Sequence, residues 1–334
     1  MELSSRPAQS GRNFPLPQAR SLPAQLFDEW KKCAQRGDFH GAWQISDEAL
    51  EINRDSDLRG LPEHLRPVWK GESVEGRRVL VRCHHGLGDT IQFSRFIPWL
   101  AKTAAEVEVR VQPSLTELLA PFREEAHIVS REEPRFERYE VELEIMELGH
   151  VFRIDLNSIP SGVPYLSATP LPVDGSAPVK VGIVWEAGDW DERRSIPFEY
   201  LRPWSDVPNV EFYSLQLDPF AAGWRGDFGH TLDASTMLQT AGMMQSLDLI
   251  ISVDTMAAHL AGALGRPVWT LLQADADWRW MQRRSDSPWY PTMRLFRQTR
   301  PGDWEDVARS VADELLTLSE GMRLGGGDRN RTDE

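Results

Sequence analysis

The chain has 334 residues and a formal net charge of −14, and 41% of its residues are hydrophobic. This length permits about two domains with separate cores, and the negative charge disfavours electrostatic binding to nucleic acid or to an anionic membrane surface. No apolar run approaches the roughly 18 residues of a transmembrane helix, and the N-terminal residues lack the apolar segment of a signal peptide, so we expect a cytoplasmic protein.

The first predicted elements are two helices. Residues 24–53 have helical periodicity, interrupted by Arg36-Gly37-Asp38. The spacing of Gly37, Phe39 and Ala42 resembles the second half of a tetratricopeptide repeat. A lone repeat cannot bury its own apolar face, so this hairpin is expected to pack on the following domain as a structural cap. The alternative is a surface that binds a protein partner.

From residue 78 onward, predicted strands and helices alternate. The first series has strands and helices at 78–83, 90–103, 107–112, 115–122 and 127–130. A segment with four prolines, 161–180, predicts a linker. The second series then follows at 179–185, 198–205, 210–216, 234–247, 248–253, 255–264, 267–272 and 304–318. This alternation indicates parallel βαβ units, which makes the chain an α/β protein.

These patterns divide the chain into segments: a disordered tail (1–22), a helical hairpin (23–60), an N-terminal Rossmann-like domain (61–170), a C-terminal Rossmann-like domain (171–320) and a second disordered tail (321–334). In two parallel sheets joined in this way, the carboxyl ends of the strands are expected to border a shared cleft. Open α/β folds usually bind ligands at that end of the sheet.

The turn after the first strand contains Gly86-Leu87-Gly88-Asp89. A dinucleotide-binding motif would need a small residue three positions after its second glycine, and Ile91 stands there, so no nicotinamide cofactor is predicted. Asp89 has two interpretations. It could be the N-cap of a helix beginning at Thr90, or it could direct a carboxylate into the cleft from the carboxyl end of the strand.

A second motif runs from residue 248 to residue 269. A strand leads to Asp254-Thr255, which cap a helix that ends at Gly265. A helix N-terminus after a strand favours a diphosphate, because free N–H groups and the helix dipole both point at the anion. His259 lies one turn further along the same face. It either bonds a ligand phosphate or ribose, or satisfies a buried carbonyl.

The loop after the first strand of the second domain carries Arg193 and Arg194. Adjacent arginines in a loop are usually solvated, but beside a cleft they can neutralise a leaving diphosphate. The two cysteines, Cys33 and Cys83, form no disulfide or metal framework. We therefore predict no metal site and no resident cofactor.

Several of these segments together resemble a known family. The stretches "GLGDTIQFSRFIPWL", "VGIVW…RRSIP", "YSLQ", "SVDTMAAHLAGALGRPVW" and "DWRWM…DSPWYPTMRLFRQ" resemble the glycosyltransferase domain of bacterial tetratricopeptide-repeat proteins. That domain is similar to the heptosyltransferases of glycosyltransferase family 9. The likeness covers about residues 64–316.

The resemblance implies a GT-B fold with the acceptor on the first domain and a nucleotide sugar on the second. It places the catalytic base at Asp89 and donor-phosphate contacts at Arg194, and at Arg193 beside it. It places the acceptor side at His84, His85, Gly86 and Gly88. The diphosphate would lie at Asp254, Thr255 and the backbone of Met256 and Ala257, with His259 nearby and Gln216 near the nucleoside.

The implied reaction is sugar transfer by a hexosyl- or heptosyltransferase. A base takes the acceptor hydroxyl proton as the new bond forms. A helix end with arginine stabilises the departing diphosphate, so no metal is required. Direct displacement would invert the anomeric centre. The neighbouring His84 and His85 could tune the base. A glycan, a lipid-linked sugar or a protein remains open as the acceptor.

The chain departs from the family pattern at 139–152, on the acceptor side, and in the short acidic loop 186–192. These departures motivate two alternatives: a non-catalytic domain that binds a nucleotide sugar or serves as a scaffold, and a nucleotide-sugar epimerase of the same fold.

Overall fold

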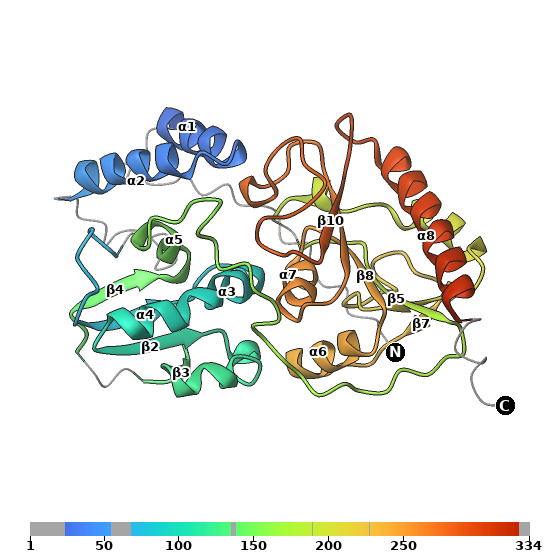
Figure 1. Cartoon of the computed structure of the whole chain (residues 1–334), viewed down its shortest axis with the longest axis horizontal. Helices are drawn as coiled ribbons and strands as arrows, with labels where there is room; N and C mark the ends of the chain where they lie inside the picture. Colours follow the sequence, from blue (N-terminus) through green and yellow to red (C-terminus); the bar gives the residue numbers. More distant parts are fainter. Residues whose placement is uncertain (1–23, 55–67, 135–137, 189, 227, 327–334) are drawn as a thin grey trace, which may run out of the picture.

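The computed structural model describes residues 24–54, 68–134, 138–188, 190–226 and 228–326, apart from the side chains of Ala24 and 322–326. Two α/β halves lie side by side, and a pair of helices lies along one edge (Figure 1). The predicted tail 1–22 lies outside the described residues, as do 55–60 of the predicted hairpin segment and residues from 327 on.

The first half is built on a parallel four-stranded sheet in the order β3-β2-β1-β4. Its strands are β1 (Arg78–Arg82), β2 (Glu106–Val111), β3 (His127–Ser130) and β4 (Val141–Glu144). The helices of this half are α3 (Leu87–Phe93), α4 (Ile97–Thr103) and α5 (Leu148–Val151). The three predicted strands are confirmed, and β4 is an addition that lies within the divergent segment 139–152.

The second half is built on a six-stranded sheet in the order β10-β9-β8-β5-β6-β7, and each strand pair is parallel. Its strands are β5 (Val179–Val184), β6 (Val210–Ser214), β7 (His230–Thr231), β8 (Leu249–Val253), β9 (Val268–Leu272) and β10 (Met293–Arg297). The helices are α6 (Met237–Gln245), α7 (Met256–Ala263) and α8 (Trp304–Gly326). The predicted fold class, two parallel-sheet domains, is confirmed.

Two predicted helices are 3₁₀ segments instead. The range 115–122 contains parts of the short 3₁₀ turns Pro113–Leu115 and Ala120–Glu124, and the range 198–205 lies within the 3₁₀ segment Phe198–Asp206. Proline explains both corrections, because its missing N–H and its ring oppose α-helical bonding beyond the first turn. Pro121 and Pro203 lie inside these segments.

The second predicted tail begins later than expected. Helix α8 continues to Gly326, so the prediction of disorder from residue 321 was wrong for 321–326. Once a helix is nucleated, each added residue gains a backbone hydrogen bond, so an established helix extends through residues with low helix propensity. Across the part of the chain described here, no helix combines the length and the apolar character needed to cross a bilayer.

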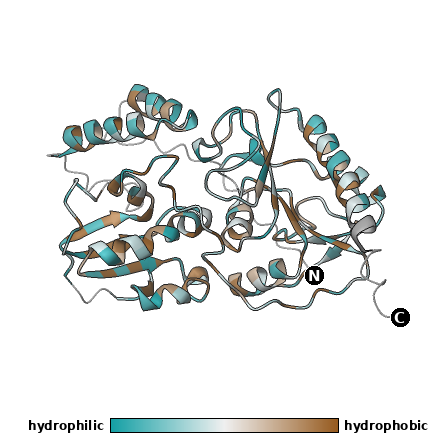
Figure 2. Ribbon diagram, viewed as in Figure 1, coloured by the Kyte–Doolittle hydropathy of each residue, from teal (hydrophilic) through white to brown (hydrophobic). Residues whose placement is uncertain are grey.

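The burial of the central strands explains why the sequence predicted them. All residues of β8 are buried, as expected for a central parallel strand covered on both faces. Figure 2 shows the corresponding hydrophobic colour on the central strands of the second half, whereas the outer helix α8 shows polar residues along its length.

Each sheet has one point at which the strand order reverses, with later strands added on the opposite side of the first strand. In the first sheet, β2 and β3 lie on one side of β1 and β4 lies on the other. In the second sheet, β6 and β7 lie on one side of β5, and β8 to β10 lie on the other. The crevices at the carboxyl ends of β1/β4 and β5/β8 are therefore the expected ligand sites. Helices α3 and α7, which follow β1 and β8, pack directly against each other.

The helical hairpin contacts both halves. Helices α1 (Ala24–Gln35) and α2 (Phe39–Asn53) are joined at Gly37, which has a φ of +80°, and Asp38 caps α2 by accepting from the N–H of Gly41. The two predicted helices are thus confirmed, as is their packing on the following domain. The likeness to a tetratricopeptide repeat stays a prediction.

Both aromatic and polar contacts join the hairpin to the two halves. Trp30 and Phe39 pack against Trp278, with ring centroids 5.2 and 6.2 Å apart. On the other side, Asp47 accepts hydrogen bonds from both Nη atoms of Arg153, each at 2.7 Å. The hairpin therefore bridges the two halves.

Candidate functional site

Asp89 lies in the first turn of α3. The helix begins at Leu87, not at Thr90, so the interpretation of Asp89 as the N-cap was wrong. The N-cap is Gly86, which has no side chain to accept a hydrogen bond. Instead, the Asp89 Oδ2 atom accepts from the backbone N–H of Gly86 at 2.9 Å. This return contact fixes one carboxylate oxygen at the carboxyl end of β1.

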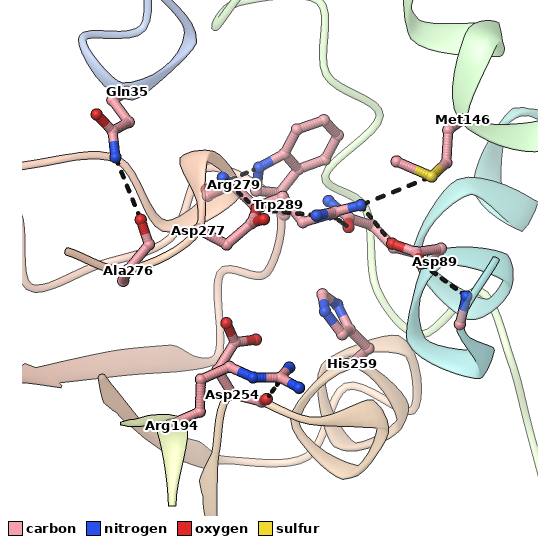
Figure 3. A network of polar contacts seen from close by, with 12 residues as sticks. Gln35, Asp89, Met146, Arg194, Asp254, His259, Ala276, Asp277, Arg279 and Trp289 are labelled. Atoms are coloured by element: carbon pink, nitrogen blue, oxygen red, sulfur yellow. Dashed lines mark hydrogen bonds and ion pairs between the residues drawn. The ribbon is translucent and has the colours of Figure 1, made fainter. Parts of the chain in front are cut away.

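The other carboxylate oxygen of Asp89 faces the second half. Its Oδ1 atom accepts a hydrogen bond from the guanidinium of Arg279, which lies on the connection between β9 and β10. Figure 3 shows Asp89 and Arg279 approaching each other from opposite halves. The Asp89 side chain is 23% exposed. The carboxylate is therefore directed across the domain boundary at Arg279, and the role predicted for Asp89 stays a prediction.

The start of α7 is where the sequence predicts the diphosphate. Thr255 is the N-cap: its Oγ1 atom accepts from the N–H of Ala257 at 3.3 Å, and its carbonyl accepts from the N–H of Ala258 at 3.2 Å. Arg194 lies beside this helix end, because its Nη1 atom donates to the Asp254 carbonyl at 2.9 Å (Figure 3). The structure thus brings together the predicted donor residues Arg194, Asp254 and Thr255.

Two buried titratable groups line this region. Burial raises the pKa of Asp254 to about 6, with a further rise from the charge of Asp277. Burial also lowers the pKa of His259 well below its usual value, and nearby arginines lower it further, so this histidine is neutral at neutral pH. Its Nδ1 atom lies 2.9 Å from the Tyr290 hydroxyl and its ring stacks on Trp280. The protein partner of His259 is therefore a hydroxyl and not the carbonyl considered from the sequence.

Gly88 allows α3 and α7 to approach closely. A Cβ atom at this position would lie 2.8 Å from the His259 Cδ2 atom and 3.4 Å from the Met256 Cα atom. The first distance is too short for unstrained packing. The glycine is therefore explained by the contact between the two halves.

Substituting Gly88→Ala is expected to destabilise the protein by about 1–3 kcal/mol, the usual range for an added methyl group in a packed interface. Urea unfolding measures this change. Gly162→Ala is the matched control, because a Cβ there meets no atom within 4 Å. Equal stability of the two variants would contradict the close approach of α3 and α7.

Two other predicted site residues, Arg193 and Gln216, form contacts with neighbouring loop residues. Arg193 pairs with Asp191 at 2.8 Å, and its side chain is 72% exposed. The Gln216 Oε1 atom accepts from the N–H groups of Trp185 at 3.1 Å and Glu186 at 3.0 Å, so it closes the turn after β5. These contacts place both residues near the β5 loop without directing them at Asp89.

The predicted acceptor-side histidines flank the β1 turn. The backbone N–H of His84 donates to the Glu144 Oε1 atom at 2.7 Å, and the carbonyl of His85 accepts from Gln112 at 2.9 Å. His84 is half-buried and His85 is exposed. The roles predicted for His84, His85 and Gly86 stay predictions.

The sequence did not single out Glu144 and Glu147, at the β4 side of the first crevice. Burial raises the pKa of Glu144 to about 7 and that of Glu147 to about 8. The Glu147 Oε2 atom accepts from the N–H of Glu144 at 2.7 Å. The alternation of Val141, Glu142, Leu143 and Glu144 was the available signal, because it predicts a half-buried strand.

Glu147→Gln is expected to be more stable than the wild type at high pH, by a margin that grows as the pH rises. The pKa of Glu147 is raised by burial from 4.5 to about 8, so its contribution to stability is present below about pH 4.5 and lost as the pH rises through about 8. Glutamine keeps an acceptor for the Glu144 N–H and has no charge to bury. The gain at high pH should be roughly 1 kcal/mol, since the side chain is partly solvated.

Thermal unfolding of the wild type and of Glu147→Gln across this pH range measures the effect. The exposed Glu75 provides the control substitution Glu75→Gln. A difference between Glu147→Gln and the wild type that stays constant with pH would contradict the raised pKa.

The loops after β5 and β6 also line a hollow of about 660 Å³. Trp185, Ser195 and Phe198 line it, together with the arginines Arg202 and Arg225 and the glutamates Glu186, Glu192 and Glu199. This volume is in the range of small-molecule sites. The hollow lies in the half that the sequence predicts to bind the donor.

The two facing parallel-sheet domains have the GT-B fold of nucleotide-sugar glycosyltransferases. The dodecameric, iron-containing glycosyltransferase TibC from enterotoxigenic E. coli H10407 has a TM-score of 0.52 and 11% identity, over 76% of this chain and 78% of TibC. E. coli ADP-heptose LPS heptosyltransferase II has a TM-score of 0.51 and 13% identity, over 74% of this chain and 99% of that enzyme. The predicted likeness to heptosyltransferases is thus confirmed for the fold.

The sequence comparisons add one curated relative. No protein-family model matches the chain. Protein FlbA of Caulobacter vibrioides (strain ATCC 19089 / CIP 103742 / CB 15) is 24% identical over 287 residues, which cover 74% of this chain and 48% of FlbA. The chain therefore spans about half the length of this relative.

Proposed function

We propose that this chain is a glycosyltransferase that moves a sugar from a nucleotide-diphosphate donor to an acceptor hydroxyl. One observation carries the proposal. The Asp89 carboxylate, at the crevice of the first half, is directed at Arg279 of the second half, and the start of α7, with Arg194 beside it, belongs to the helix that packs against α3. This arrangement supplies a base and a diphosphate site on opposite sides of one boundary.

In the proposed reaction, Asp89 accepts the proton of the acceptor hydroxyl while that oxygen bonds to the anomeric carbon. The bond between the anomeric carbon and the phosphate oxygen breaks, and its electron pair leaves with the nucleoside diphosphate. The N-terminus of α7 and Arg194 stabilise the charge that develops there. Displacement in one step inverts the anomeric centre, and the positive potential comes from protein groups rather than a metal.

The sugar in this proposal is a hexose or a heptose, and the acceptor is a glycan, a lipid-linked sugar or a protein side chain. The fold similarity to heptosyltransferase II supports the donor class. The carboxylates of Glu144 and Glu147 lie on the acceptor side, where the chain departs from its relatives.

The test is a thermal-shift panel of nucleotide sugars with the purified chain, followed by transfer assays with those that bind. A ligand at about 100 times its Kd should stabilise the folded protein by about 2.7 kcal/mol. Transfer should persist in the presence of a chelator and yield the inverted product. A panel in which no nucleotide sugar raises the melting temperature would contradict the proposal.

A second candidate function is a non-catalytic domain that binds a nucleotide sugar. The direct packing of α3 on α7 and the pairing of Asp89 with Arg279 favour it, because both fill the boundary between the halves. Donor binding without transfer or hydrolysis, over many acceptors, would support this candidate. Release of an isomerised sugar from the donor alone would instead identify an epimerase.

A further inference from the structure

Arg279 is fixed in place by the turn that carries it. The 3₁₀ turn Trp278–Trp280 is capped by Asp277, whose Oδ1 atom accepts from the Arg279 N–H at 3.0 Å and from its Nη1 atom at 2.8 Å. The Trp289 Nε1 atom donates to the Arg279 carbonyl at 3.0 Å. The backbone and the guanidinium of Arg279 are therefore both held within the second half.

The guanidinium nevertheless reaches into the first half. Its Nε atom donates to the Gln92 Oε1 atom at 2.7 Å, and its Nη2 atom donates to Asp89. Gln92 and Asp89 lie on successive turns of the same face of α3. A rigid planar fork with several donors can set the orientation of a carboxylate, which a single flexible ammonium cannot do equally well. Asp89 is thus held on one oxygen by Gly86 and on the other by Arg279.

The turn is supported from behind by the helical hairpin. The Gln35 Nε2 atom donates to the Ala276 carbonyl at 3.2 Å, and the Gln282 N–H donates to the Gln35 carbonyl at 3.0 Å. The ring of Trp30 packs edge-on against Trp278. A continuous set of contacts therefore runs from α1 through the turn to the Asp89 carboxylate (Figure 3).

We propose that Arg279 is a positioning residue that fixes the orientation of the Asp89 carboxylate at the boundary between the two halves. This inference rests on the proposed function. Arginine stays protonated throughout the physiological pH range, so it does not exchange a proton with Asp89.

The electrostatic surroundings of Asp89 include groups from every element that packs near it. They are Arg279 and Asp277 on the turn, Glu144 at the end of β4, His259 on α7, and His84 and His85 before α3. Burial alone would lower the pKa of Arg279, but the carboxylates of Asp277, Asp89 and Asp254 outweigh it and raise that pKa. Arg279 is the charged partner in direct contact with the base.

The experiment compares Arg279→Gln and Arg279→Lys with the wild type in kcat, in KM and in donor affinity by calorimetry. Arg279→Gln should lower kcat by about 100-fold, the loss expected for a misplaced catalytic group, with donor Kd within about threefold.

Arg279→Lys should recover part of kcat, since it restores the charge but not the fork. Arg284→Gln is the matched control. Arg284 lies on the same connection between β9 and β10, but it pairs with Asp286, with 2.6 Å between the Nη2 and Oδ2 atoms, and not with Asp89. It should behave as the wild type in all three measurements.

An Arg279→Gln enzyme with an unchanged kcat would overturn the inference, and so would a loss of kcat that Arg279→Lys does not recover in any part. Failure of the proposed function gives a different result, in which the wild type itself transfers no sugar. Crystal structures then decide the positioning role: an Asp89 carboxylate that keeps its orientation in Arg279→Gln overturns it, and one that turns away supports it.

Discussion

Asp89→Asn is expected to lower the rate of sugar transfer by about 10²–10⁴-fold, the usual contribution of a general base. Asparagine matches aspartate in shape but cannot take the acceptor proton. Donor affinity should stay close to that of the wild type, because the proposed diphosphate site consists of Arg194 and the start of α7 and not of Asp89. Initial rates and calorimetric titration with the donor measure the two quantities separately.

A matched control separates the chemistry of Asp89 from the loss of an ion pair. Asp286→Asn removes a carboxylate that pairs with Arg284, and its side chain is 71% exposed. This variant should transfer sugar at the wild-type rate. If Asp89→Asn retains turnover close to that of this control, Asp89 is not the base.

Phe39→Ala is expected to reduce the free energy of unfolding by about 3–5 kcal/mol, the range for removing a buried aromatic ring. Phe39 is only 1% exposed and lies at the start of α2. Its ring packs against Trp43 of the hairpin and against Trp278 and Trp289 of the second half. The substitution therefore leaves a cavity where the hairpin joins the second half.

Urea unfolding of Phe39→Ala and of Phe27→Ala provides the comparison. Phe27 lies on α1 but is 56% exposed, so its loss should change stability by less than about 0.5 kcal/mol. Similar effects of the two substitutions would contradict the role of the hairpin as an integral part of the fold.

The strands were predictable because central parallel strands are nearly continuous apolar runs. β5 and β8 illustrate this, since all their residues except Lys180 are buried. β10 was missed because charged Arg294 and Arg297 interrupt its pattern. Two predicted α-helices became 3₁₀ segments where proline removes a backbone donor.

The cap and helix around Thr255 were predictable from local signals, because a strand, a cap and a helix follow one another in the sequence there. Asp89 was also found from its position after a strand. Its partner Arg279 was not, because the two residues are 190 positions apart and the contact depends on how the halves pack. Periodicity reports which face of an element is buried, but it does not report which element covers that face.

The bridging hairpin has a consequence for the protein's cooperativity. Its aromatic side chains and its charged groups contact both halves, so detaching it exposes apolar surface and breaks ion pairs in each. We therefore expect loss of structure in one half to weaken the support of the other, so that the two halves unfold together rather than in sequence.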